Sequence, residues 1–170
     1  MSYVLGCDPG SPSWYAAVDS DGKLTWATYS VGSVTPPPAA VIIEWAEAKR
    51  GVYRGKHTFA GDLMRLAVEQ ERIKQLYLPV CPVYCVPRQV ILAQAGYSPR
   101  RDGKADKWVS QYLMPEYAKR ATGFHDGGYG MYYTWRGTPL AKVGARDAMM
   151  AALFATTALN AQYLANPGRE

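Results

Sequence analysis

The fold is decided by the stretch Tyr3-Val4-Leu5-Gly6-Cys7-Asp8-Pro9-Gly10. Its first five residues are aromatic, apolar or small, a composition typical of a short buried strand. Asp8 is the first charged residue after this run, and Pro9 and Gly10 prevent the strand from continuing. The sequence therefore predicts a strand over residues 3–7 that ends in a turn beginning with a carboxylate.

Two more strands are predicted directly after this turn. They cover residues 14–18 and 24–31, and the connecting Asp19-Ser20-Asp21-Gly22 has the composition of a hairpin turn, so the three strands should form an antiparallel meander. Beyond a run of three prolines, Ala40-Val41-Ile42-Ile43 is too short for a helix and rich in β-branched residues. This run predicts a central strand that is buried on both faces and ends at Glu44.

The rest of the chain is predicted to alternate between helices and strands. Apolar residues recur at helical spacing over residues 59–76, residues 80–86 have the composition of a strand, and residues 104–114 and 144–164 are expected to be helical. A strand meander followed by alternating strands and helices is typical of an α/β layer structure. With 170 residues in all, we expect a single domain spanning residues 1–170.

The composition predicts a globular protein of the cytoplasm. Hydrophobic residues make up 48% and charged residues 19%, and no apolar run approaches the roughly 20 residues that span a bilayer. The amino terminus lacks the pattern of a secretory signal, and no membrane partner is expected. The odd count of cysteines, Cys7, Cys81 and Cys85, argues against disulfides, and no second Cys or His pair is spaced to complete a zinc site.

The net charge favours a polyanionic partner. Nineteen Lys and Arg residues outnumber 14 Asp and Glu residues, which gives +5 at pH 7. Positive residues gather in two glycine-containing stretches that have the character of loops or loop edges, where small residues allow close approach to a phosphate backbone. The first stretch holds Lys49, Arg50, Arg54 and Lys56, and the second holds Arg100, Arg101, Lys104 and Lys107. Either stretch taken alone fits an ordinary solvated basic face equally well.

Three acidic residues are attached to otherwise hydrophobic elements. Asp8 follows a predicted buried strand, Glu44 ends another, and Asp147 lies in the first turn of the last predicted helix. Each has an ordinary explanation by itself: a turn cap, a strand end at solvent, and an interaction with a helix amino terminus. If the three converge, however, ionised carboxylates in apolar surroundings require a cation, and oxygen-only ligands favour Mg²⁺ or Mn²⁺.

Several stretches resemble RuvC-type Holliday junction resolvases, in the order in which that family has them. Val4-Leu5-Gly6-Cys7-Asp8-Pro9-Gly10-Ser11 is similar to the family's first strand, which is followed by Asp-Pro-Gly, and Val41-Ile42-Ile43-Glu44 to its fourth strand, which ends in a catalytic carboxylate. Val86-Pro87-Arg88-Gln89-Val90 resembles the stretch of the family in which a strand leads to an Arg-Gln-Val turn. Gly103-Lys104-Ala105-Asp106-Lys107 resembles the lysine-bearing helix that follows this turn in the family. Arg146-Asp147-Ala148-Met149 resembles the closing Ala-Asp-Ala-Leu motif.

The resemblance implies a ribonuclease-H-like fold, with a mixed five-stranded sheet of an antiparallel meander and then parallel strands, flanked by helices. It implies that Asp8, Glu44 and Asp147 hold two Mg²⁺ ions, about 3.5–4 Å apart and replaceable by Mn²⁺, and that Lys107 approaches the scissile phosphate. The implied activity is hydrolysis of four-way DNA junctions by a homodimer. Relatives from phages and organelles match equally well, so the expected location is a bacterial or phage-infected cytoplasm, or an organelle if a transit peptide has been removed. Residues expected to contact DNA are Lys104, Lys107, Arg100, Arg101, Arg54, Lys56 and Trp45.

The sequence departs from the family in three places. Gly144 stands where the family has a fourth acidic residue or a histidine, and His125, Asp126 and Glu47 are equally good candidates for a substitute ligand. The aromatic wedge expected after Glu44 could be Trp45 or Tyr53. A possible insertion at residues 115–140 is rich in aromatic and basic residues, which would either stack on unpaired bases or form a small core or subunit contact.

Two other functions remain open at this stage. The absence of a fourth ligand at Gly144 is compatible with a catalytically weakened protein that binds branched DNA. Because ribonuclease-H-like folds carry several activities, cleavage of another nucleic acid, such as RNA, is the second alternative.

Overall fold

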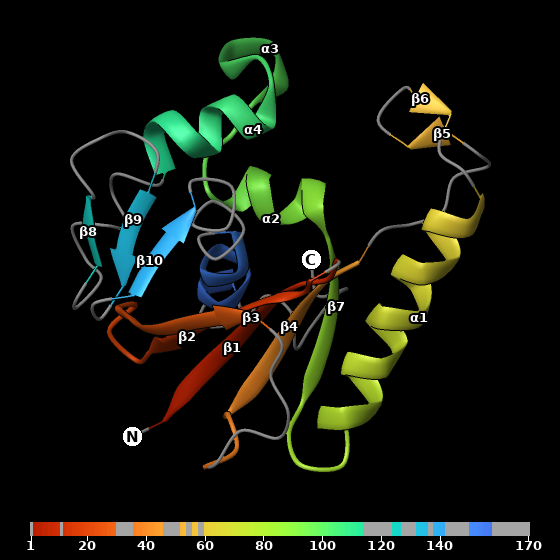
Figure 1. Cartoon of the computed structure of the whole chain (residues 1–170), viewed down its shortest axis with the longest axis vertical. Helices are drawn as coiled ribbons and strands as arrows, with labels where there is room; N and C mark the ends of the chain where they lie inside the picture. Colours follow the sequence, from red (N-terminus) through yellow and green to blue (C-terminus); the bar gives the residue numbers. More distant parts are fainter. Residues whose placement is uncertain are drawn as a thin grey trace, which may run out of the picture.

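The structure is a computed structural model that describes residues 2–10, 12–29, 36–45, 52–53, 56–57, 60–113, 124–126, 132–135, 138–141 and 150–157. Its largest element is a five-stranded sheet (Figure 1). The strands are β1 (Tyr3–Asp8), β2 (Trp14–Asp19), β3 (Leu24–Tyr29), β4 (Ala40–Trp45) and β7 (Val83–Pro87). They lie in the order β3-β2-β1-β4-β7.

The sheet is mixed, as the sequence predicts. Strands β1, β2 and β3 form an antiparallel meander, whereas β4 pairs parallel to β1 and β7 pairs parallel to β4. The turn between β2 and β3 also forms as expected, because the Asp19 side chain accepts hydrogen bonds from the backbone N–H groups of Asp21 and Lys23, and Gly22 takes a positive φ of 76°. The α/β class and the mixed sheet are therefore confirmed.

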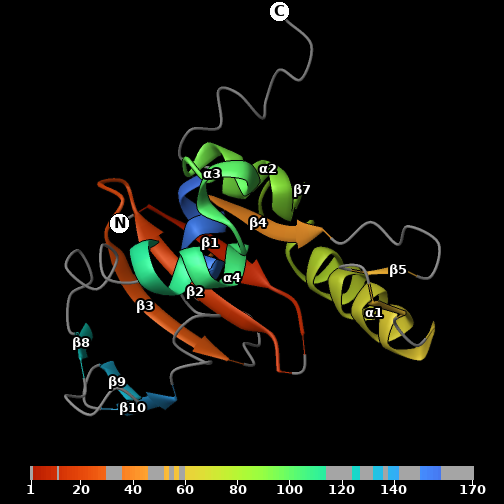
Figure 2. The same ribbon diagram turned by 90° about the horizontal axis from the view of Figure 1, so that it is seen from above.

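Helices cover both faces of the sheet (Figures 1 and 2). Helix α1 (Ala60–Tyr77) places Ile73 and Tyr77 in one core with Leu5 and Cys7 of β1. The opposite core joins Val4 of β1 to the helical segment 150–157, and also includes residues of α2 (Arg88–Gln94). Because side chains alternate along a strand, odd-numbered residues of β1 face α1 and even-numbered ones face segment 150–157.

Segment 150–157 lies unusually close to β1 at Gly6. A Cβ atom placed on Gly6 would be 1.5 Å from the carbonyl oxygen of Ala151 and 2.7 Å from the backbone nitrogen of Ala155. Only a residue without a side chain fits there, and Ala151 and Ala155 are themselves small and fully buried. Gly6 therefore sets how closely this segment approaches the first strand.

The remaining described elements are short. Beyond α2 come α3 (Pro99–Asp102), α4 (Ala105–Trp108) and a π-helical turn (Val109–Leu113). Strands β5 (Val52–Tyr53) and β6 (Lys56–His57) pair with each other. Strands β8 (Phe124–Asp126), β9 (Tyr132–Trp135) and β10 (Thr138–Ala141) form a separate three-stranded sheet. Within the described ranges, no helix is both long and apolar enough to cross a membrane.

Two predictions of local structure are wrong. Arg88-Gln89-Val90 was expected to be a turn but begins helix α2, because Pro87 fixes φ at −59° and the following apolar residues Ile91 and Leu92 bury one helical face. The stretch with Arg100 and Arg101 was expected to be a loop but forms α3, which starts with Pro99 at its first position and ends at Gly103 with φ 72°.

We predict that Gly6→Ala destabilises the fold by about 3 kcal/mol or more, because the new methyl group would meet backbone atoms that cannot rotate away. Chemical denaturation should show the loss as a lower transition midpoint with an unchanged slope. Gly10→Ala is the matched control, since its Cβ would meet the backbone oxygen of Pro12 at 3.3 Å, a contact that a shift of a few tenths of an ångström relieves. Equal midpoints for both variants would contradict the close approach at Gly6.

Candidate functional site

Asp8 and Glu44 lie next to each other at one edge of the sheet. The parallel ladder between β1 and β4 has Cys7 opposite Ile43 as its last pair, and Asp8 and Glu44 are the next residue on each strand. Neighbouring strands are about 4.8 Å apart. The two carboxylates, which are 36 positions apart in sequence, are therefore brought together at the carboxyl ends of adjacent parallel strands.

Both carboxylates project from the same face of the sheet. By alternation Asp8 shares a face with Val4 and Gly6, and Glu44 shares a face with Ile42. Val4 and Ile42 belong to the core that includes segment 150–157. Asp8 and Glu44 are thus directed to the side of the sheet that this segment covers.

The Glu44 side chain is buried. The residue is only 6% exposed, and among the described residues no hydrogen bond or ion pair reaches its carboxylate. Asp8 is half-buried, and its negative charge acts on the neighbouring Cys7, where burial and then this charge raise the pKa of the thiol. Two carboxylates held side by side, one of them buried, favour a bound cation when both are ionised.

The third expected ligand lies outside the described residues. Asp147 precedes the described helical segment by three positions, and Gly144 and Glu47 are also outside the described ranges. Across the residues that the structure does describe, no group of three His, Cys, Asp or Glu side chains gathers as a metal site. The described part of the site is a pair of carboxylates, and its hard oxygen donors fit Mg²⁺ or Mn²⁺ better than a softer metal.

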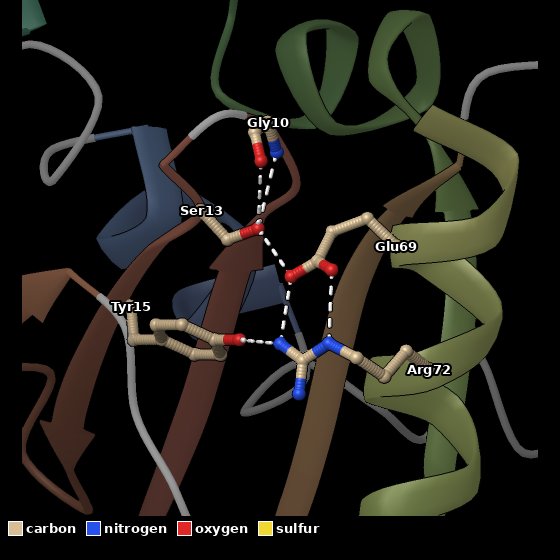
Figure 3. Close-up of polar contacts among 5 residues, drawn as sticks. All are labelled: Gly10, Ser13, Tyr15, Glu69 and Arg72. Atoms are coloured by element: carbon tan, nitrogen blue, oxygen red, sulfur yellow. Dashed lines mark hydrogen bonds and ion pairs between the residues drawn. The ribbon is translucent and has the colours of Figure 1, made fainter. Parts of the chain in front are cut away.

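A hydrogen-bonded network ties helix α1 to the turn that follows Asp8 (Figure 3). Ser13, which is 5% exposed, donates its hydroxyl proton to Glu69 Oε1 at 2.8 Å and accepts the backbone N–H of Gly10 at 3.2 Å. Glu69 in turn accepts two hydrogen bonds from the Arg72 guanidinium, at 2.7 and 2.9 Å. The turn between β1 and β2 is therefore held by a charged pair on α1.

The electrostatics of this network follow from its contacts. Hydrogen bonds from Arg72 are the largest influence on the pKa of Glu69 and lower it, burial opposes them, and a hydrogen bond from Ser13 adds to the lowering. Arg72 also donates to the Tyr15 hydroxyl at 3.3 Å, but burial is the larger influence there and raises the pKa of Tyr15 to about 12. At neutral pH the network consists of a carboxylate, a guanidinium and a neutral phenol.

The next residue of the same helix reaches the other strand. Gln70, which is 2% exposed, donates from Nε2 to the backbone carbonyl oxygen of Glu44 at 3.1 Å. The sequence pattern alone did not indicate a functional role for Ser13, Glu69 or Gln70. The available signal was a polar residue on the buried face of an amphipathic helix, since Gln70 precedes the buried Ile73 and Tyr77 by three and seven positions.

The second basic stretch lies on α3 and α4, which are near α2 and beyond the carboxyl ends of the parallel strands (Figure 1). Arg100, Lys104 and Lys107 are exposed. Arg101 is also exposed, but its guanidinium pairs with Asp102 at 2.8 Å and donates to the Gly96 carbonyl oxygen. Arg101 thus braces this stretch, which leaves less of its guanidinium for an outside partner.

An aromatic contact fixes the shape of the same stretch. The rings of Tyr97 and Trp108 have centroids 5.4 Å apart, and the Tyr97 hydroxyl donates to the Gly103 carbonyl oxygen at 2.5 Å. Asp102 accepts the backbone N–H of Ser98 at 2.7 Å. These contacts hold the short backbone stretch from which the side chains of Lys104 and Lys107 project.

Trp45 lies on the other face of the sheet from Glu44. It pairs with Pro87 of β7, and the ammonium of Lys74 on α1 lies 5.9 Å from the centre of its ring. The ring is half-buried beneath α1. Its predicted contact with DNA therefore requires an approach from the α1 side, away from the carboxylate pair.

The remaining predicted residues are described only in part. Lys56 and Tyr53 belong to the short β5–β6 pair, while Arg54 lies outside the described residues. Within residues 115–140, the structure describes parts of the three-stranded sheet, in which Phe124 pairs with Trp135 and Asp126 with Tyr133. The side chains of this segment are outside the described part, so both interpretations of it remain predictions.

Neither a scan against protein-family models nor a search of curated proteins found a match. The function is therefore inferred from the residues and their geometry.

We predict that acid weakens the fold partly through Glu69. Because its pKa is lowered in the folded protein, its contribution is present above the ordinary value of 4.5 and is lost as the pH falls below that value towards the folded pKa. The wild type should lose unfolding free energy as the pH falls below about 4.5, and Glu69→Gln should lose less. The difference in this loss should be about 0.5–1 kcal/mol, as expected for a partly exposed ion pair. The measurement is urea denaturation across a pH series.

Gln75→Ala is the control for this series. It removes a contact with Glu71 on the same helix without removing a titrating group. Parallel pH curves for the wild type and Glu69→Gln would show that the Glu69–Arg72 pair does not contribute.

Proposed function

We propose that this chain is a divalent-metal-dependent DNA endonuclease of the RuvC type that hydrolyses phosphodiester bonds at four-way junctions. The observation that carries the proposal is the placement of Asp8 and Glu44. They are adjacent, on one face of the sheet, at the carboxyl ends of parallel strands. In open α/β sheets, this edge is where ligands bind.

The sheet supports a ribonuclease-H-like fold as part of this proposal. An antiparallel meander continues into two parallel strands in the order β3-β2-β1-β4-β7, with α1 on one face and segment 150–157 on the other. This is the arrangement that the resemblance implies. In this arrangement the carboxyl ends of β1 and β4 would form the catalytic edge together with the last helix.

In this proposal Asp8, Glu44 and Asp147 hold the metal. Asp147 precedes Met150 by three residues, and the segment that begins there packs on Gly6, two residues before Asp8. A bound Mg²⁺ or Mn²⁺ would lower the pKa of a water molecule and offset charge on the phosphate. Of these carboxylates, that of Glu44 is held in a buried position, which bulk water would reach poorly.

Exposed cations beside this edge would bind the DNA. Lys107 lies on α4, Lys104 directly precedes α4, and Arg100 lies on α3. From these positions their positive charges can contact phosphates near the scissile bond. Lys107 is assigned to the scissile phosphate itself. Because a four-way junction has two strands to cut symmetrically, the active form is a homodimer with two sites related by a two-fold axis.

Labelled four-way junction, duplex DNA and an RNA–DNA hybrid, each incubated with Mg²⁺, Mn²⁺ or a chelator, test this proposal. We expect metal-dependent cutting of the junction alone. Glu44→Gln, Asp8→Asn and Asp147→Asn should each reduce the rate at least about 1,000-fold, since a metal ligand supplies several kcal/mol to the transition state. Junction affinity in chelator should remain close to that of the wild type.

The other results have definite meanings. Junction binding without products would favour the weakened binding protein suggested by Gly144, and cutting of the hybrid would favour a ribonuclease. Undiminished cutting by Glu44→Gln would contradict the assignment of the site.

Lys107→Ala tests the DNA-binding surface separately. Removing one phosphate contact should lower the slope of log K against log salt by about 1 and weaken junction binding at low salt. Lys23→Ala is the control, since Lys23 is exposed just beyond the turn that follows β2, at the opposite edge of the sheet. Equal slopes for the two variants would exclude Lys107 from the interface.

A further inference from the structure

We infer that helix α1 acts as a clamp that positions the two carboxylates through consecutive residues, Glu69 and Gln70. The clamp is defined as Ser13, Glu69, Gln70 and Arg72. The inference rests on the proposed function, because it assigns these residues to holding the metal-binding edge. None of them touches the metal or the substrate, so they are positioning residues.

Gln70 holds the end of strand β4. Its side chain is 2% exposed and its amide nitrogen donates to the backbone carbonyl oxygen of Glu44 itself at 3.1 Å. A hydrogen bond to this carbonyl restrains the peptide plane that follows Glu44, and therefore the piece of backbone from which the Glu44 side chain projects. Because both partners are buried, an alternative orientation would leave polar groups without partners.

Glu69 holds the turn that leaves strand β1. It accepts the hydroxyl proton of Ser13, whose oxygen also accepts the backbone N–H of Gly10. Only Pro9 separates Gly10 from Asp8, and its ring fixes one of the intervening torsions. The restraint is therefore transmitted to Asp8 over a short and stiff piece of backbone.

Arg72 keeps Glu69 in place. Its two hydrogen bonds to the carboxylate leave Glu69 one favoured orientation, in which Oε1 meets Ser13 (Figure 3). Glu69 and Gln70 are consecutive on a helix of 18 residues, so their side chains leave the helix about 100° apart. One side chain can therefore reach the β1–β2 turn while the other reaches β4.

The consequence is a preorganised metal site. One rigid helix restrains both strand ends, so the spacing of the carboxylates of Asp8 and Glu44 is set before a metal binds. Outer groups that orient metal ligands typically change metal affinity by 10–100-fold when they are removed. A role limited to packing would instead lower stability and leave the metal affinity of the folded protein unchanged.

The test measures Mn²⁺ affinity of the full chain from the electron paramagnetic resonance signal of free Mn²⁺, well below the unfolding transition. Gln70→Met removes the donor at similar volume, and Ser13→Ala removes the link to Gly10 without altering α1. We expect each to weaken Mn²⁺ binding by about tenfold. Glu71→Ala, on the exposed side of the same helix, should change it less than twofold.

Failure of the clamp and failure of the proposed function give different results. If the wild type binds Mn²⁺ and both variants bind it equally well, the clamp is wrong and the metal site stands. If the wild type binds no Mn²⁺, the proposed function fails and the clamp fails with it. Should Gln70→Met not fold, as judged by circular dichroism, Ser13→Ala decides the outcome.

Discussion

The parallel pairing of β1 with β4 determines where the candidate metal ligands lie. It aligns Cys7 with Ile43, and therefore brings the next two residues, Asp8 and Glu44, to the same edge and the same face. A shift of the register by one residue would turn one carboxylate to the opposite face, because side chains alternate along a strand. The apolar run of β4, buried on both faces, makes such a shift costly.

Both sides of the sheet contribute to this edge. On one face the missing side chain of Gly6 lets segment 150–157 approach β1, and on the other α1 reaches the two strand ends through Glu69 and Gln70. Buried polar groups such as Glu44 and Gln70 add little to stability compared with apolar packing. Their arrangement is better explained by a requirement for one fixed geometry at the edge of the sheet.

The sequence predicted those parts of the structure that depend on local pattern. The strands of the meander, the apolar β4 and the amphipathic α1 all follow from periodicity and turn residues, as does the position of both carboxylates at strand ends. It did not predict α2, because the resemblance implied a turn at Arg88-Gln89-Val90, where the helix begins. Nor did it predict the contacts of Ser13 and Gln70, because hydrogen bonds between residues 26 and 56 positions apart leave no local pattern. The position of Asp147, outside the described residues, remains a prediction.

Crystals grown with Mn²⁺ provide the most direct measurement of the central claim, through an anomalous difference map at the manganese absorption edge. A peak is expected between the carboxylates of Asp8 and Glu44, on the face of the sheet that carries segment 150–157. A map with no peak at this edge, in which the Glu44 carboxylate is paired with a basic side chain instead, would contradict this expectation.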